Sequence, residues 1–225
     1  MISRRLLRIK ALSVFYACNR KELDDLEQAE QELMLSIRKS YDLYHYLLLF
    51  IIALSDLARE KVALSRMKKI PSPEDINPNT RFAENRVILQ LRNNEELHRY
   101  TEAMPSLWGK KDRITGFKSL NKWMDTLGLT WANHTEVVRM VYNEMTQWLT
   151  YQDYMASQDD SYKADQRFVK ELVTKLFPAS EELSASLEEQ SVYWNDDLLF
   201  VASMIRNSLG RFREHDDGRS MAMPP

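Results

Sequence analysis

Residues 22–69 read ELDDLEQAEQELMLSIRKSYDLYHYLLLFIIALSDLAREKVALSRMKK. The apolar run at 47–54 lies between His45 and Asp56 and is too short to cross a bilayer. N-terminal to this run, apolar side chains recur at steps typical of one helix face, at Leu23, Leu26, Leu33, Ile37 and Tyr41. We therefore predict one long helix, or two in succession, whose apolar centre forms the core of the protein.

The rest of the chain also favours helices. Only 5 of its 225 residues are Gly and 7 are Pro, whereas helix-forming residues are plentiful, so turns should be scarce. We predict an all-α fold, a multi-helix bundle, with a first helix from Ser3 as N-cap to about Ala17. Further helices are expected at about 82–103, 117–127, 134–156, 164–177, 180–192 and 195–213.

A loop divides the chain after the long helix, because Pro71, Pro73 and Pro78 fall within eight residues. We predict an N-terminal segment 1–70 with an Arg-rich helix and the long acidic and apolar helix. A helical region follows at 71–160, and a third segment at 161–213. Residues 214–225 should form a frayed polar tail.

The net charge of −2 conceals a basic N-terminus. Residues 1–21 contain six Lys or Arg and no carboxylate, while residues 22–60 contain nine carboxylates and three bases. Arg4, Arg5 and Arg8 share a helical sector of roughly 100°, and Lys10 points elsewhere. Because arginines at a helix N-terminus oppose the macrodipole, this arrangement suggests a functional reason for their position.

Two interpretations of the basic helix stay open at this point. The arginines could be solvated, or paired with the acidic helix that follows. Alternatively, their guanidinium groups bind phosphates, and RNA is then the favoured polyanion. In the second interpretation the N-terminal half of the helix meets RNA and the apolar C-terminal half anchors it.

Enzyme and metal sites are not expected. The sequence has no Gly-rich phosphate loop, no paired cysteines, no serine nucleophile elbow and no HExxH motif. Glu95 and His98 have the Glu-x-x-His spacing of di-metal bundles, but no matching second pair exists, so we interpret the spacing as chance. Asp196 and Asp197 are interpreted as first-turn helix residues. We predict no catalytic residue, no metal site and no cofactor.

Two features bear on location. The lone Cys18 fits a reducing compartment, since it has no partner for an internal disulfide. The opening SRRLLR is similar to a twin-arginine export signal, but the long apolar stretch and small-residue cleavage site of such a signal do not follow. We therefore expect a cytoplasmic protein.

The first helix resembles that of the NusB transcription antitermination family. Its residues fit the pattern RRxxRxxALxxhY, where h is apolar: Arg4, Arg5, Arg8, Ala11, Leu12, Phe15 and Tyr16. A second stretch, DQRFVKELVTKLFPASEELSASLEEQSVYWNDDLLFVASMIRNSL, is also similar to the family. About a hundred residues separate the two stretches, as in longer NusB-like proteins with an inserted helical region. The family's closing helices have no counterpart after Ser208, so we expect either a fragment or an imitation of the family pattern by the second stretch.

The resemblance implies a NusB-like bundle that binds the boxA element of nascent ribosomal RNA together with the ribosomal protein NusE, within an RNA polymerase antitermination complex. It assigns RNA contact to Arg4, Arg5, Arg8 and Tyr16, to which we add the neighbouring cation Lys10. A homodimer is also possible. The alternatives are a non-catalytic helical scaffold for proteins, and an RNA-modifying enzyme with a NusB-like targeting domain, although the cofactor-binding domain of such an enzyme is absent from this sequence.

Overall fold

The computed structural model describes residues 4–20, 26–103 and 134–216, and within these ranges the chain is helical with no β-strand. This confirms the predicted all-α, multi-helix bundle. The first elements are α1 (Arg4–Arg20), α2 (Leu26–Arg66), α3 (Pro73–Ile76), α4 (Arg86–Arg92) and α5 (Glu95–Ala103). They are followed by α7 (His134–Gln147), α8 (Leu149–Ala156), α9 (Tyr162–Glu171), the π-helical turn η1 (Leu172–Leu176), α10 (Phe177–Ala179), α11 (Glu181–Gln190) and α12 (Trp194–Leu209).

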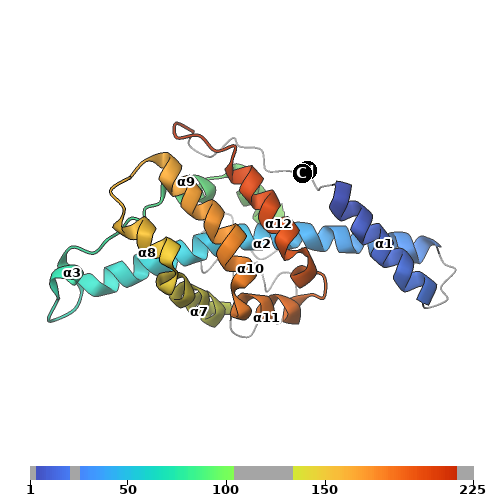
Figure 1. Ribbon diagram of the computed structural model, residues 1–225, viewed down its shortest axis with the longest axis horizontal. Helices are drawn as coiled ribbons and strands as arrows, with labels where there is room; N and C mark the ends of the chain where they lie inside the picture. Colours follow the sequence, from blue (N-terminus) through green and yellow to red (C-terminus); the bar gives the residue numbers. More distant parts are fainter. Residues whose placement is uncertain (1–3, 21–25, 104–133, 217–225) are drawn as a thin grey trace.

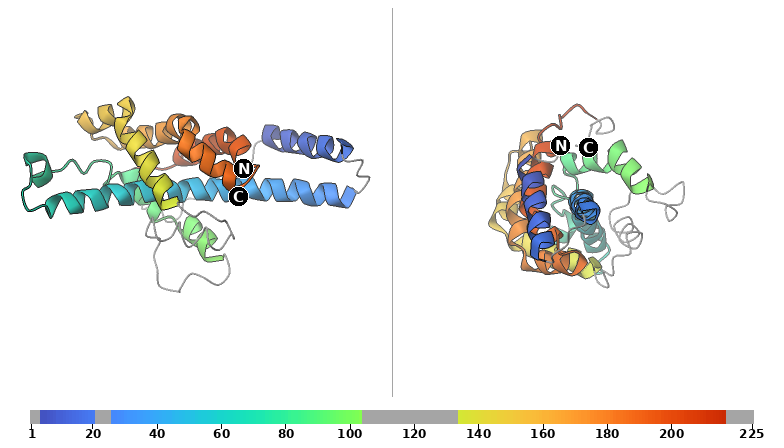
Figure 2. Two further views of the ribbon diagram at one scale, coloured as in Figure 1. Left: turned by 90° about the horizontal axis from the view of Figure 1, so that it is seen from below. Right: turned by 90° about the vertical axis from the view of Figure 1, so that its right-hand side faces the viewer.

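Helix α2 is the central element of the molecule (Figure 1). It spans 41 residues and is continuous, which decides between the one or two helices predicted for this stretch. Helices α1, α12 and α9 lie along one side of α2, and α5 lies on the other, as the two views in Figure 2 show. The N-terminal part of α2 and α1 together extend beyond the rest of the bundle.

The core forms around the middle of α2. Every residue from Asp42 to Ser55 of this helix is buried, so the predicted apolar centre is confirmed. Tyr46 stacks on Trp194 of α12 with ring centroids 5.3 Å apart, and Phe50 meets Phe177 edge to face. All three predicted segments, 1–70, 71–160 and 161–213, contribute to one buried cluster.

Local chemistry explains where the helices break. The predicted helix 82–103 is divided into α4 and α5 because Asn94 accepts a hydrogen bond from the Leu97 amide and starts a new helix. The predicted helix 134–156 is divided at Trp148, whose backbone is extended. The π turn η1 ends two residues before Pro178, and its wider turn accommodates the ring that would otherwise crowd a regular helix.

Several predicted features lie partly or wholly outside the residues that the structure describes. The predicted helix 117–127 lies outside them, as do Ser3 and residues 217–225 of the polar tail. Residues 214–216 are described and contact α4, since Glu214 pairs with Arg86 and the Asp216 carbonyl accepts from Gln90. None of the described helices is long and apolar enough to cross a membrane.

Candidate functional site

The inner face of α1 fixes this helix to the bundle. Leu6, Lys10 and Val14 are buried at four-residue steps along α1, and they are the only buried residues of its described length. Lys10 is 6% exposed, and its Nζ donates to Asp197 Oδ2 on α12 at 2.8 Å. Ser40 of α2 donates to the same carboxylate oxygen at 2.6 Å. Three helices therefore meet at one buried carboxylate.

The prediction that Lys10 contacts RNA is wrong for this structure. Its ammonium is buried and paired, so a phosphate could reach it only by breaking an ion pair inside the protein. The spacing of Lys10 between Leu6 and Val14 was the sequence signal for burial. Its partner Asp197 was predicted only as a first-turn residue, which it is, but its link to α1 was missed.

The outer face of α1 carries the predicted arginines. Arg4, Arg5 and Arg8 are exposed and form no ion pair with any described residue. The interpretation that they pair with the acidic part of α2 is therefore not supported within the described residues. No acidic residue occurs in the first turn of α1, so the positive end of the helix dipole and the three guanidinium groups add their positive charge at one end of the helix.

Apolar and aromatic side chains continue the outer face toward the C-terminus of α1. Leu12, Phe15 and Tyr16 are 71%, 68% and 63% exposed. On a helix of about 100° per residue these three side chains and the three arginines share a sector of about 120°, opposite Lys10. Val14 lies in the apolar half that was expected to anchor the helix, but Leu6 and Lys10 are buried as well, so the anchor is the inner face along α1.

Tyr16 has one neighbour on this surface. The Arg20 guanidinium lies 6.0 Å from the centre of the Tyr16 ring, at the outer limit of a cation–π contact. The ring is otherwise open to solvent, so a base or an apolar partner could stack on it. We call the set Arg4, Arg5, Arg8, Leu12, Phe15 and Tyr16 the α1 outer face.

A buried polar cluster lies at the junction of α2 and α5, away from this face. The His45 ring stacks on Tyr100 with centroids 3.4 Å apart, and its Nδ1 lies 2.8 Å from the Tyr41 carbonyl. Tyr100 donates to Asp42 Oδ1 at 2.8 Å. Burial lowers the pKa of His45 to about 4 and raises the pKa of Asp42. These groups satisfy one another, which indicates a structural role for the cluster.

A second buried polar cluster joins α4, α8 and α9. Tyr154 donates to Asp165 Oδ1 at 2.9 Å, and Arg86 Nε donates to Asp165 Oδ2 at 2.9 Å. Asn85 caps α4 by accepting from the amides of Val87 and Ile88. Every charge here has a partner, which again indicates a structural role.

Metal chemistry finds no support in the described residues, where no group of three or more His, Cys, Asp or Glu side chains could hold an ion. His98 Nε2 lies 2.9 Å from the Arg92 carbonyl, so this ring is engaged by the backbone. The Glu95–His98 spacing therefore has a structural explanation.

No known family model, curated protein or solved structure matches the chain. The class of protein is accordingly defined by its own fold and surface. It is an all-α multi-helix bundle that presents an unpaired basic and aromatic helix face.

Proposed function

We propose that this protein is a non-catalytic RNA-binding factor of the NusB type, which holds single-stranded RNA on the α1 outer face. The observation that carries the proposal is the exposure of Arg4, Arg5 and Arg8 in one sector with Tyr16. Arginine forks bind phosphate oxygens, and an exposed aromatic ring stacks on a base. Single-stranded RNA presents both groups together.

The attachment of α1 supports the same proposal. Leu6, Val14 and the buried Lys10–Asp197 pair hold the inner face, so the orientation of the outer face is fixed before a ligand arrives. A surface that is already ordered loses less conformational entropy on binding than one that must first fold.

The RNA would be a boxA-type element of a ribosomal RNA transcript, bound together with the ribosomal protein NusE within an antitermination complex. These partners come from the resemblance of α1 to the NusB pattern. A second protein fits the mixed composition of the surface, because Leu12 and Phe15 offer apolar area that phosphates would not cover.

The test is a titration of boxA RNA and a scrambled control, with and without NusE, at two salt concentrations. We expect tighter, salt-sensitive binding to boxA when NusE is present. The variant Arg4→Glu/Arg5→Glu/Arg8→Glu should bind more weakly and with a smaller salt slope, reduced by about 0.7 for each phosphate that is no longer bound. Unchanged affinity and slope in this variant would disprove RNA binding by α1.

A protein scaffold is the second candidate function. It is favoured by the exposed apolar side chains that α1 and the N-terminal part of α2 share, among them Leu12, Phe15, Leu26, Met34 and Leu35. A scaffold would bind its partner with little dependence on salt and would bind both RNAs weakly or not at all. The same titration therefore separates the two functions.

A further inference from the structure

A second basic surface lies on α9, η1 and α12, apart from α1. Its side chains surround a groove of about 480 Å³. Five of the lining residues are cationic and one is a carboxylate: Lys163, Arg167, Lys170, Lys175, Arg206 and Glu171. We call these six residues the α9 groove. Gln166 and Thr174 complete its lining.

The charges in the α9 groove are not balanced. Glu171, the only carboxylate that lines it, pairs with Lys175 at 2.8 Å. The other four cations form no ion pair with any described residue, and Lys170 Nζ has only the amide oxygen of Gln166 at 3.1 Å. Burial together with the positive charges of Arg206 and Arg213 lowers the pKa of Lys170. Cations that outnumber the carboxylates beside them fit an anionic ligand.

The helices that carry the α9 groove lie on the same side of α2 as α1. Helices α1, α12 and α9 lie along that side in both views (Figures 1 and 2). Lys10 fixes α1 at Asp197, and Arg206 lies nine residues farther along α12, which corresponds to about 14 Å of helix. The α1 outer face is on the opposite side of α1 from Lys10, so an RNA strand that contacts both surfaces must cross the width of α1 as well as this length of α12.

We propose that the α9 groove binds the phosphate backbone of the same RNA strand that occupies the α1 outer face. The inference rests on the proposed function for the identity of the ligand. The exposed lysines and arginines would contact phosphates rather than base edges, so this segment of the strand would be held with little regard to its sequence.

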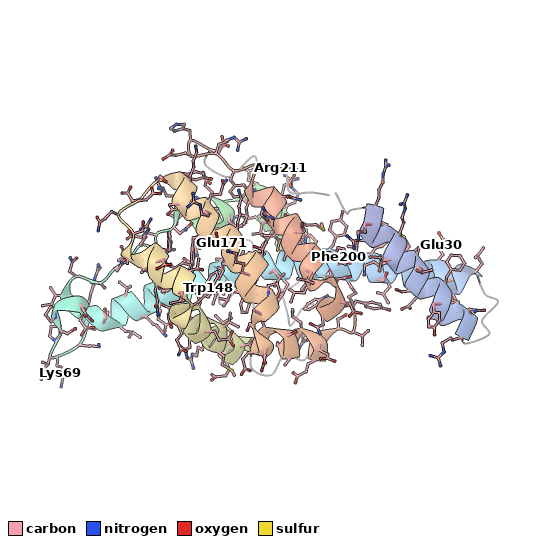
Figure 3. All side chains as sticks on the ribbon, in the orientation of Figure 1. Glu30, Lys69, Trp148, Glu171, Phe200 and Arg211 are labelled. Atoms are coloured by element: carbon pink, nitrogen blue, oxygen red, sulfur yellow. The ribbon has the colours of Figure 1, made fainter. Side chains whose placement is uncertain are left out.

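The experiment compares single-stranded RNAs of about 6 and about 20 nucleotides, the longer one exceeding a typical single-strand site. The groove variant is Lys170→Glu/Arg206→Glu. Its control is Arg66→Glu/Lys69→Glu, which makes the same change in charge with two exposed residues at the end of α2 farthest from α1, where Figure 3 labels Lys69. The variant Arg4→Glu/Arg8→Glu tests RNA binding by the α1 outer face and reverses two charges, as the groove variant does.

For the longer RNA, we expect the groove variant to bind about tenfold more weakly and to have a salt slope smaller by about 1.4, as expected when two phosphates are released from the protein. Its affinity for the shorter RNA should match the wild type, and the control should bind both RNAs normally. Wild-type affinity and slope of the groove variant for the longer RNA would overturn the inference.

A measurement on the wild-type protein tests the same inference without depending on whether a variant folds. Acylation of lysines by an amine-reactive reagent, read by mass spectrometry, should slow at Lys163 and Lys170 when the longer RNA is bound, and should not slow at Lys69. Equal reactivity with and without RNA would overturn the inference. If only the α1 variant lost binding, the groove would be excluded and the proposed function would stand. If only the groove variant lost binding, the proposed role of α1 would be excluded, and a strand shared by the two surfaces would be excluded with it.

Discussion

Lys10 and Asp197 are 187 residues apart in sequence, and their side chains meet at 2.8 Å inside the protein. The pair joins the N-terminal helix to α12, and Ser40 adds a hydrogen bond from α2. Because both charges are almost fully buried, each depends on the other for compensation of its lost hydration. The pair thus determines where α1, with its arginines, sits on the bundle.

Removing one partner of this pair should strongly destabilise the fold. We expect Asp197→Leu to lower the free energy of unfolding by about 3 kcal/mol or more, because Lys10 is left charged and buried. Lys10→Met/Asp197→Leu should recover most of that loss, since two apolar groups of similar size replace the charges. Urea unfolding measures both. The exposed neighbour substitution Asp196→Ala should stay within about 0.5 kcal/mol of wild type. A double variant no more stable than the single one would contradict this account.

His45 should make the stability depend on pH. Burial lowers its pKa to about 4, below the ordinary value of 6.5, so between these values the unfolded chain binds the proton and the folded protein does not. The contribution of His45 to the free energy of unfolding is therefore present above pH 6.5 and is lost as the pH falls toward 4, by about 1.4 kcal/mol per pH unit.

The matched variant for this prediction is His45→Asn, which can keep a hydrogen bond to the Tyr41 carbonyl but does not titrate. Asp42 acts in the opposite direction because burial raises its pKa, and both proteins contain it. Urea unfolding across pH 4 to 7 should show a steeper loss in the wild type than in the variant. Parallel curves would mean that His45 is hydrated in the folded protein.

Asn85 is expected to be important for the junction of α4 with α8 and α9. Its side chain accepts from two amides and donates to the Tyr154 hydroxyl at 3.0 Å. Asn85→Ala should cost about 2 kcal/mol of stability, because the cap is removed and buried polar groups are left unsatisfied. The exposed Asn93 at the other end of α4 provides the control, since its side chain makes no cap, and Asn93→Ala should be nearly neutral. Thermal or urea unfolding distinguishes the two.

Sequence reasoning predicted the central helix because local pattern decides it. The uninterrupted apolar run 47–54 had to be buried in a helix-rich chain, and α2 is continuous through it. The exposure of Arg4, Arg5 and Arg8 also followed from their shared sector. Helix breaks at Asn94 and Trp148 were missed, because one asparagine cap or one extended residue leaves the hydrophobic pattern unchanged.

Contacts across the chain could not be predicted in the same way. Lys10 was assigned to the ligand surface because its charge matched that of the arginines. Its four-residue spacing from Leu6 and Val14 indicated the buried face, but its pairing with Asp197 could not be read from the sequence. Four of the five cations of the α9 groove fall within residues 163–175, but Arg206 lies 31 residues farther along the chain, so the sequence alone does not show that it joins them. A basic surface built from two helices becomes visible only after they pack together.

The exposed apolar part of α1 leads to the last prediction. Leu12 and Phe15 face solvent, so Leu12→Ser/Phe15→Ser should change the free energy of unfolding by no more than about 0.5 kcal/mol. Leu6→Ala, on the buried face of the same helix, should cost about 2 to 5 kcal/mol.

If the outer face binds RNA and a protein partner, Leu12→Ser/Phe15→Ser should also weaken the complex with NusE and leave the salt slope unchanged, because no charge is removed. Destabilisation comparable to that of Leu6→Ala would instead show that these side chains are buried in solution, against another part of the chain or in a homodimer. Sedimentation of the wild type separates those two, since only a homodimer makes the apparent mass depend on concentration.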